Sequence, residues 1–225
     1  MDLNKNVQEL LKLVKAAHTM HSAYHFASAE ELIAPMATLQ KANQIDYYAQ
    51  LVANRFDKFK ARNHFFLQPE QLAKMCKIKE SYSKILDAQS QFPLSFCHGD
   101  LKSPNCFYVK GEDPYLLDWQ YIHLNKGVSD IVFLLVESVD YDERVVSLVE
   151  NYYFLLWEEV DGSMTHEQYM FDFKCALCIF PFFVTVWFNS EDSDKLLDKT
   201  FPIRFMKKLM LYYDRYIDDS FLDSF

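Results

Sequence analysis

The sequence has 225 residues, of which 50% are apolar, with 20 Phe and 14 Tyr but only four Gly. Such a chain can bury a large core, and its few glycines favour helices over a turn-rich β sandwich. The net charge of −9 without a basic block argues against a nucleic-acid partner. Five cysteines without disulfide-like spacing indicate a reducing compartment, and the amphipathic N-terminus is not a signal peptide, so a cytoplasmic, intracellular location is expected.

The first part of the chain, residues 1–92, is predicted to be helical. Apolar side chains recur at helical spacing over residues 4–25 and again over 45–62. Pro69 stands at a favoured first-turn position and begins a third helix that runs to about residue 90.

The pattern changes after Pro93, and residues 94–119 are predicted to hold a loop and a β hairpin. Residues 94–98, 106–109 and 115–119 are short β-type runs. The turn-forming residues 110–114 separate the last two runs, so we expect these two to pair.

Helical patterns return over residues 129–225. Ser129 is the expected N-cap of a helix to residue 138, and further patterns cover 142–160, 165–189 and 202–217. The most apolar run, 175–188, is too short for a bilayer, so no membrane span is expected. No repeat or long linker divides the chain. One domain, mainly α with a small β element (α+β), is therefore predicted for residues 1–225.

The segment FCHGDLKSPNCF, residues 96–107, carries the candidate chemistry. If the hairpin forms, Asn105 and Asp118 should lie opposite each other at its open end, where an amide oxygen and a carboxylate suit Mg²⁺. Asp100 would then face what the metal holds and act as a base or positioner in phosphoryl transfer. Lys102 is expected to contact the transferred phosphoryl group. His98 is expected to pack beneath the loop.

The string HGDLKSPNCFYV…YLLDWQ resembles the catalytic core of the aminoglycoside and choline kinase-like phosphotransferases, including their ecdysteroid kinase-like branch. These proteins share the protein-kinase-like fold. The family motif reads His-Gly-Asp, then Asn, then Asp followed by Trp or Phe, and Asp100, Asn105 and Asp118 match it. The resemblance implies ATP and Mg²⁺ as cofactors, with Asn105 and Asp118 binding them. It also implies that Asp130, in VSDIVFLL, braces the catalytic loop from the start of a helix.

The resemblance covers only the larger, C-terminal lobe of that fold. The four glycines, at 99, 111, 127 and 162, do not form a Gly-rich phosphate loop, and no strand carries a nucleotide-anchoring Lys. An N-terminal lobe of on the order of 100 residues is therefore expected to be absent. A separate polypeptide would supply it, or the gene is truncated or split.

Three functions follow in order of preference. The first is an ATP- and Mg²⁺-dependent kinase acting on a hydroxyl of a small molecule, incomplete without an N-terminal lobe. The second is an inactive kinase-like remnant or protein-binding module. A Ser/Thr protein kinase lobe ranks last, because Gly99 replaces the usual Arg and Asp-Trp-Gln at 118–120 replaces Asp-Phe-Gly. The sequence does not name the acceptor.

Two weaker signals are expected to be structural. His18, His21 and His25 share one helical face, and zinc could use two of them, but no obvious Cys or carboxylate completes a set, so packing and surface roles are favoured. Cys175 and Cys178 lie in an apolar helix, where they are expected to act as small buried hydrophobic residues.

Overall fold

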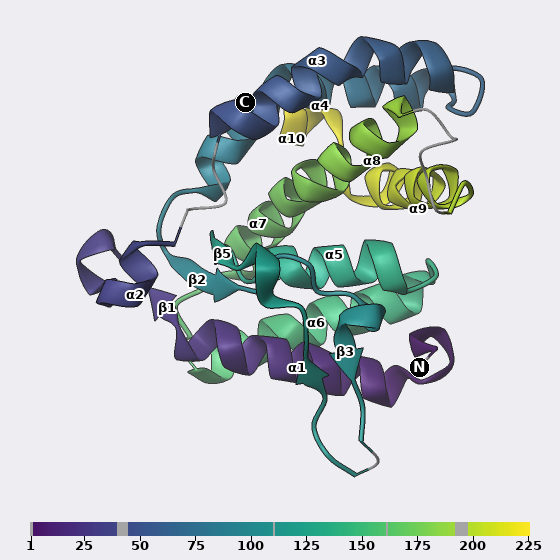
Figure 1. The fold of residues 1–225 in the computed structure, drawn as a ribbon. Helices are drawn as coiled ribbons and strands as arrows, with labels where there is room; N and C mark the ends of the chain where they lie inside the picture. Colours follow the sequence, from purple (N-terminus) through teal and green to yellow (C-terminus); the bar gives the residue numbers. More distant parts are fainter. Residues whose placement is uncertain (1, 40–44, 110, 161, 192–197) are drawn as a thin grey trace. The chain divides into compact units, whose positions relative to one another are not determined.

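Figure 1 shows a computed structural model of the chain, which describes residues 2–39, 45–109, 111–160, 162–191 and 198–225, with the backbone alone for 45 and 46. The contacts divide the chain into two compact units, the first made of Met1–Ala42 and Gln89–Ala176, the second of Asn43–Ala88 and Leu177–Phe225. Helices dominate both, and the first unit adds short antiparallel strands, so the predicted α+β class is confirmed. That the whole chain is a single lobe stays a prediction.

Three helices form the body of the first unit. Helix α1 (Val7–Ala23) begins at Asn6, whose side chain caps it by accepting from the Glu9 amide, and it packs on α6 (Glu143–Val160) and α5 (Val128–Ser138). Figure 1 shows these helices side by side. The face of α1 toward them is fully buried because apolar residues recur every three or four positions: Leu10, Leu13, Val14 and Ala17. The short 3₁₀ turn η1 (Leu3–Lys5) precedes α1.

The described residues of this unit also form five short strands. Strands β1 (His25–Phe26), β2 (Leu94–Cys97) and β5 (His123–Asn125) form an antiparallel sheet in that order. Phe26, Leu94 and Leu124 make its core, which is extended by side chains around η2 (Ala29–Glu31) and α2 (Ala34–Ala37). Strands β3 (Cys106–Phe107) and β4 (Tyr115–Leu116) pair as the predicted hairpin, although they are shorter than expected. Lys110, in the predicted turn, lies outside the described residues.

The structure corrects two boundaries in this unit. The first helix ends at Ala23 rather than at His25, because His25 enters β1 and pairs with Ser95. Ser129 is not the N-cap of α5: Gly127 occupies that position, and the Ser129 hydroxyl lies within the first turn, where it donates to the Lys126 carbonyl at 2.7 Å.

The second unit is built from helices packed on helices. Its elements are α3 (Ile45–Asn63), α4 (Pro69–Gln89), α8 (Phe180–Ser190), α9 (Phe201–Tyr216) and α10 (Asp219–Leu222). The predicted single helix over residues 165–189 is wrong, because α7 (His166–Cys178) ends before Ile179 and α8 begins there. Pro181 explains the break, since proline lacks the amide and clashes with the preceding turn of a continuous helix.

Polar side chains of α3 satisfy the last carbonyls of α8. The Asn63 amide donates to the Asn189 carbonyl at 3.1 Å, and the Arg62 guanidinium donates to the Ser190 carbonyl at 2.9 Å. Arg55 pairs with Glu191 and lies over the Trp187 ring, 3.4 Å from its centroid. Carbonyls at a helix end have no intrahelical partner, so these contacts stabilise the end of α8.

One helical stretch, His166–Ser190, has the length and apolar composition of a membrane-crossing segment. However, 67% of its most apolar window is buried inside the protein, which is typical of a core helix in a soluble protein. Cys175 and Cys178 are fully buried, as expected.

Candidate active site

The loop between β2 and β3 requires glycine at position 99. Gly99 has φ +83°, and a Cβ built on it would lie 2.1 Å from the Tyr121 carbonyl oxygen and 2.8 Å from Nδ1 of His123. A larger residue therefore cannot be accommodated unless the backbone shifts. The arginine of protein-kinase loops does not fit here, which counts against the Ser/Thr protein kinase alternative.

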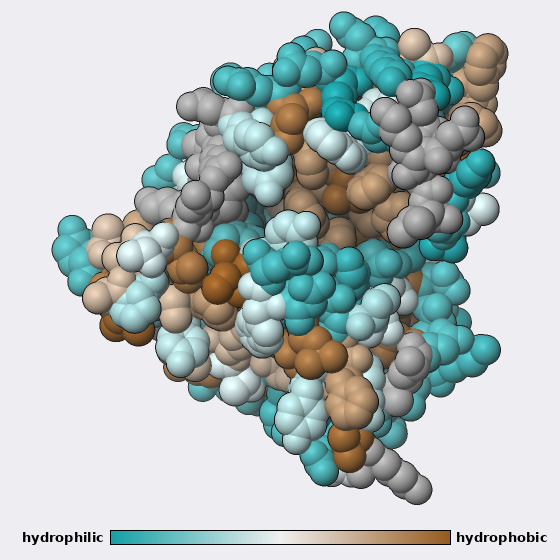
Figure 2. All heavy atoms as spheres, viewed as in Figure 1, coloured by the Kyte–Doolittle hydropathy of each residue, from teal (hydrophilic) through white to brown (hydrophobic). Residues whose placement is uncertain are grey.

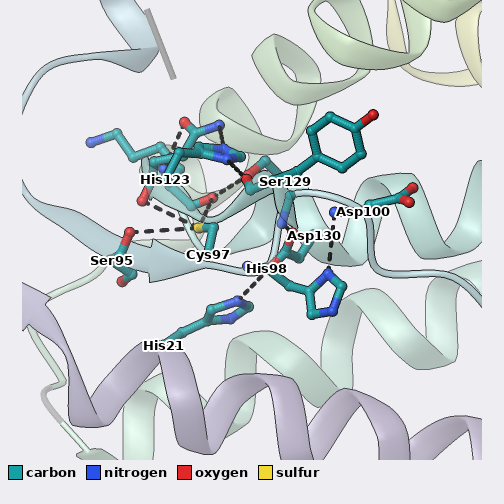
Figure 3. A network of polar contacts seen from close by, with 12 residues as sticks. His21, Ser95, Cys97, His98, Asp100, His123, Ser129 and Asp130 are labelled. Carbon is teal, nitrogen blue, oxygen red and sulfur yellow. Dashed lines mark hydrogen bonds and ion pairs between the residues drawn. The ribbon is translucent and has the colours of Figure 1, made fainter. Parts of the chain in front are cut away.

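Helix α5 holds this loop at two points. Asp130, buried at the start of α5, accepts from the His98 amide at 2.7 Å and from the Gly99 amide at 2.9 Å, one bond to each carboxylate oxygen (Figure 3). At the other end of α5, the Ser138 hydroxyl accepts from the Ser103 amide at 2.7 Å. The loop backbone is thus fixed by side chains from one helix.

The charge on Asp130 is retained in spite of burial. Burial by itself raises the pKa of this carboxyl, but the hydrogen bond from His21, with a smaller contribution from the hydrogen bond of the Gly99 amide, lowers the pKa below its ordinary value. Asp130 is therefore an ionised acceptor for the two loop amides.

His98 packs beneath the loop and connects it to the hairpin. It is fully buried, its Nε2 donates to the Leu117 carbonyl at 2.8 Å, and its Nδ1 accepts from the Asp100 amide at 3.3 Å. Its ring lies 4.8 Å from that of Trp119. These contacts place His98 under Asp100.

Asp100, Lys102 and Asn105 meet in one cluster. The Lys102 ammonium lies 2.8 Å from Oδ2 of Asp100, and the Asn105 amide nitrogen donates to the same oxygen at 3.0 Å and to the Asp100 carbonyl at 2.9 Å. Asp100 and Asn105 are buried, whereas Lys102 is half-buried. The amide nitrogen of Asn105 thus faces Asp100.

Asp118 has an uncommon backbone conformation. Its φ and ψ are both 64°, in the left-handed region that asparagine and aspartate tolerate better than other residues. It is exposed, and its Oδ2 accepts from the Gln120 amide at 3.3 Å. Non-glycine residues in this region often occur at functional sites.

The predicted pairing of Asn105 with Asp118 is one residue out of register. Cys106 pairs with Leu116, and the Leu117 amide donates to the Asn105 carbonyl at 2.8 Å, so Leu117 is opposite Asn105. Asp118 comes directly after this position, where its left-handed conformation interrupts the alternation of the strand. An amide oxygen and an exposed carboxylate still flank the base of the hairpin, and such oxygens suit Mg²⁺.

Sequence reasoning missed His21 as part of the site. His21, predicted to be a packing or surface residue, is fully buried and contacts Asp130 (Figure 3). Its partner in the fold lies 109 residues away, so local spacing contains no signal for the contact. The other two histidines have different neighbours. His18 packs on Trp157, and His25 contacts the Ser95 hydroxyl at 3.0 Å.

His21, Cys97 and Asp130 also form a group of potential metal ligands, with atoms within 4.8 Å of one another. Burial and the nearby Asp130 charge raise the pKa of the Cys97 thiol well above its ordinary value, so the thiolate that a metal requires is disfavoured. The thiol instead faces the carbonyls of Ser95, Asn125 and Lys126. Hydrogen bonding explains this group better than a metal does.

A small cleft lies elsewhere in the first unit. Its wall includes Lys126, Trp157 and Asp172, but not Asp100, Lys102 or Asn105. Burial raises the pKa of Asp172. The cleft is therefore separate from the loop cluster.

Comparisons with known proteins agree with the motif. Residues 8–161 match the sequence model of the ecdysteroid kinase-like family. The fold is similar to the crystal structure of choline kinase LicA from Streptococcus pneumoniae, with a TM-score of 0.58 and 15% identity. That match covers 100% of this chain and 66% of the choline kinase, so the chain spans just under two thirds of that protein's length. No curated protein sequence matches. Because the family model covers more than half of its residues, the chain belongs to the ecdysteroid kinase-like family.

Proposed function

We propose that the chain is an ATP- and Mg²⁺-dependent phosphotransferase that acts on a hydroxyl group of a small molecule. The observation that carries the proposal is the contact of Asp100 with both Lys102 and Asn105, on a loop whose amides bind Asp130. The family and the choline kinase-like fold support a small-molecule kinase.

Each residue has a role that follows from its surroundings. Asp100 would orient the acceptor hydroxyl and take its proton, because it is a carboxylate held in place by two donors. Lys102, next to Asp100, would offset negative charge on the transferred phosphoryl group. Asn105 and Asp118 would hold Mg²⁺, which when bound with ATP neutralises charge on the phosphate oxygens. Asp130 and His98 would keep the loop in position.

The setting of the reaction belongs to the same proposal. None of the five cysteines, all of which the structure describes, forms a disulfide, and this fits a reducing, cytoplasmic location. An N-terminal lobe would cover the nucleotide. The acceptor is a small molecule of unspecified structure.

Thermal-shift titration with Mg²⁺-ATP tests nucleotide binding, since a ligand that binds only the folded state raises the melting temperature. We expect a Mg²⁺-dependent rise for the wild type and for Asp113→Asn, which changes an exposed acid of the hairpin turn. Asp118→Asn should lose most of it. Asp100→Asn should keep it and lose ATP turnover. The absence of a rise, both for the chain alone and with an N-terminal lobe polypeptide added, would reject the proposal.

A second candidate, a kinase-like module that binds another protein, is favoured by one surface. Apolar side chains gather over the β3–β4 hairpin in Figure 2. The exposed large apolar residues of this segment are Phe107, Val109, Tyr115, Leu117, Trp119, Tyr121 and Ile122. Clustered apolar residues on a surface often mark an interaction site. ATP turnover that disappears in Asp100→Ala, with the fold intact, would exclude a purely non-enzymatic module.

A further inference from the structure

A chain of buried hydrogen bonds runs from helix α6 through helix α1 to the catalytic loop. The Tyr153 hydroxyl of α6 lies 2.8 Å from Nδ1 of His21 on α1. Nε2 of His21 lies 3.0 Å from Oδ2 of Asp130, and that oxygen also accepts from the His98 amide. Tyr153 and His21 are fully buried, and Asp130 is 2% exposed.

The direction of these bonds follows from Asp130. An ionised carboxylate only accepts, so the proton of the His21–Asp130 bond belongs on Nε2. Nδ1 can then accept from the Tyr153 hydroxyl. Burial raises the pKa of Tyr153 well above its ordinary value, so this hydroxyl keeps the proton that it donates. Each member thus orients the next, from Tyr153 to His21 to Asp130 to the loop amides.

Tyr153 and His21 pack closely against the backbone at the start of α5. A Cβ built on Gly127, the N-cap of α5, would lie 2.5 Å from the Tyr153 hydroxyl and 2.8 Å from Cγ of His21. The Tyr153 ring in turn packs edge-on against the His21 ring at 5.9 Å. Histidine and tyrosine are therefore held against the start of α5, next to Asp130.

We propose that His21 is a positioning residue for the catalytic loop: as the Nε2–H tautomer it passes orientation from Tyr153 to Asp130 and so fixes the amides of His98 and Gly99. The catalytic part of this inference rests on the proposed function, because it is Asp100, the next residue, whose placement would suffer. The proposal assigns His21 no contact with substrate or nucleotide.

His18 offers a matched control on the same helix. It lies one turn before His21, is 4% exposed and packs against the same Tyr153 ring. Among the described residues, its Nε2 has no hydrogen-bond partner, and no hydrogen bond joins His18 to Asp130. His18→Leu and His21→Leu therefore remove similar side chains, but only the second breaks the connection to the loop.

The experiment follows amide hydrogen exchange at His98 and Gly99 by NMR. We expect exchange to accelerate at least about tenfold in His21→Leu and to remain near the wild-type rate in His18→Leu. His21→Gln, which keeps a donor toward Asp130, should restore part of the protection. Tyr153→Phe, which keeps the ring, should give a smaller acceleration and serves if His21→Leu does not fold. Unchanged exchange in both His21→Leu and Tyr153→Phe, or equal acceleration in His18→Leu, would overturn the proposal.

Two further measurements separate positioning from general stability. The ¹⁵N shifts of the His21 ring should show the Nε2–H tautomer, and the Nδ1–H tautomer would overturn the proposed direction. Slow Mg²⁺-ATP hydrolysis should lose about tenfold or more in kcat in His21→Leu, with KM for ATP within about twofold. An unchanged kcat beside faster exchange would refute the catalytic part. If the wild type neither binds nor hydrolyses ATP, the proposed function fails, whereas the exchange result still decides the loop contact.

Discussion

In both units, polar side chains bind backbone groups of another segment, but these backbone groups belong to a loop in the first unit and to a helix end in the second. In the first, the buried carboxylate of Asp130 binds the amides of a loop, and in the second, Arg62 and Asn63 bind the carbonyls at the end of α8. The loop holds Asp100, a candidate catalytic residue, whereas the contacts at the end of α8 have a structural role. We infer that equal losses of stability in the two units have unequal effects on nucleotide chemistry.

Gly99→Ala should have the largest effect. The new Cβ meets the Tyr121 carbonyl, and φ is +83°, so strain and overlap together should lower the free energy of unfolding by about 3 kcal/mol or more. Gly111→Ala is the control: φ is +87° there, but nothing lies within 4 Å of the added Cβ, so about 1 kcal/mol is expected. Urea unfolding of both variants measures the difference, and similar losses would show that the Tyr121 contact is unimportant.

Asp130→Asn should come next. It removes the ionised acceptor shared by His21 and two loop amides, and leaving these buried donors without their charged acceptor should lower the free energy of unfolding by about 3 kcal/mol. Because the folded-state pKa is lowered, this stability exists above the unfolded pKa and disappears as the pH falls through the folded pKa.

Asp172→Asn provides the control for that experiment. Asp172 is as buried, but burial raises its pKa, so replacing it with a neutral amide should change stability little. Denaturant unfolding at pH 7 compares the two. Equal losses would mean that burial of any acid, rather than contact with the loop, sets the cost.

Asn63→Ala tests the second unit. It leaves the buried Asn189 and Phe59 carbonyls without this donor and should lower the free energy of unfolding by about 2 kcal/mol. Lys60→Ala, an exposed change in the last turn of α3, should be nearly neutral. Under conditions where Asn63→Ala remains folded, its Mg²⁺-ATP response should equal that of the wild type. A lost response would contradict the contrast between the units.

Protonation of His18 at acid pH should lower the free energy of unfolding. This is the smallest of the four predicted effects. Burial lowers the pKa of His18 from 6.5 to about 4. The unfolded chain binds this proton more readily, so stability falls as the pH drops below 6.5 and levels off near 4. About 1–2 kcal/mol should be lost between pH 7 and pH 5. His18→Leu should reduce that slope in thermal melts, and an unchanged slope would assign it to other groups.

The sequence was most informative where the candidate functional residues lie close together in one short segment. Asp100, Lys102 and Asn105 lie within six positions, so the motif named all three as candidate residues, although their direct contacts with one another were not predicted. Asp130 was found because a helix start follows the hairpin at a family-typical distance. The long helices were recovered from their apolar periodicity, which local burial imposes.

The missed features depend on contacts between distant segments. Strands β1 and β5 have two and three residues, too few to show alternation, and they exist because β2 lies between them. The contact of His21 with Asp130 spans 109 positions and has no local pattern. Acceptor choice is equally unreadable, because helices that shape a pocket show only which face is buried.

The two attachments of the loop to α5 make the length of that helix a constraint. Asp130 and Ser138 are eight positions apart, about 12 Å along the axis, and each binds a different loop amide. Deleting one residue between them would rotate the far end by about 100° and carry Ser138 away from Ser103. Insertions and deletions should therefore be rare in α5 across the family even where its side chains vary. The distance between Asp130 and Ser138 must match the distance between the loop amides that they bind.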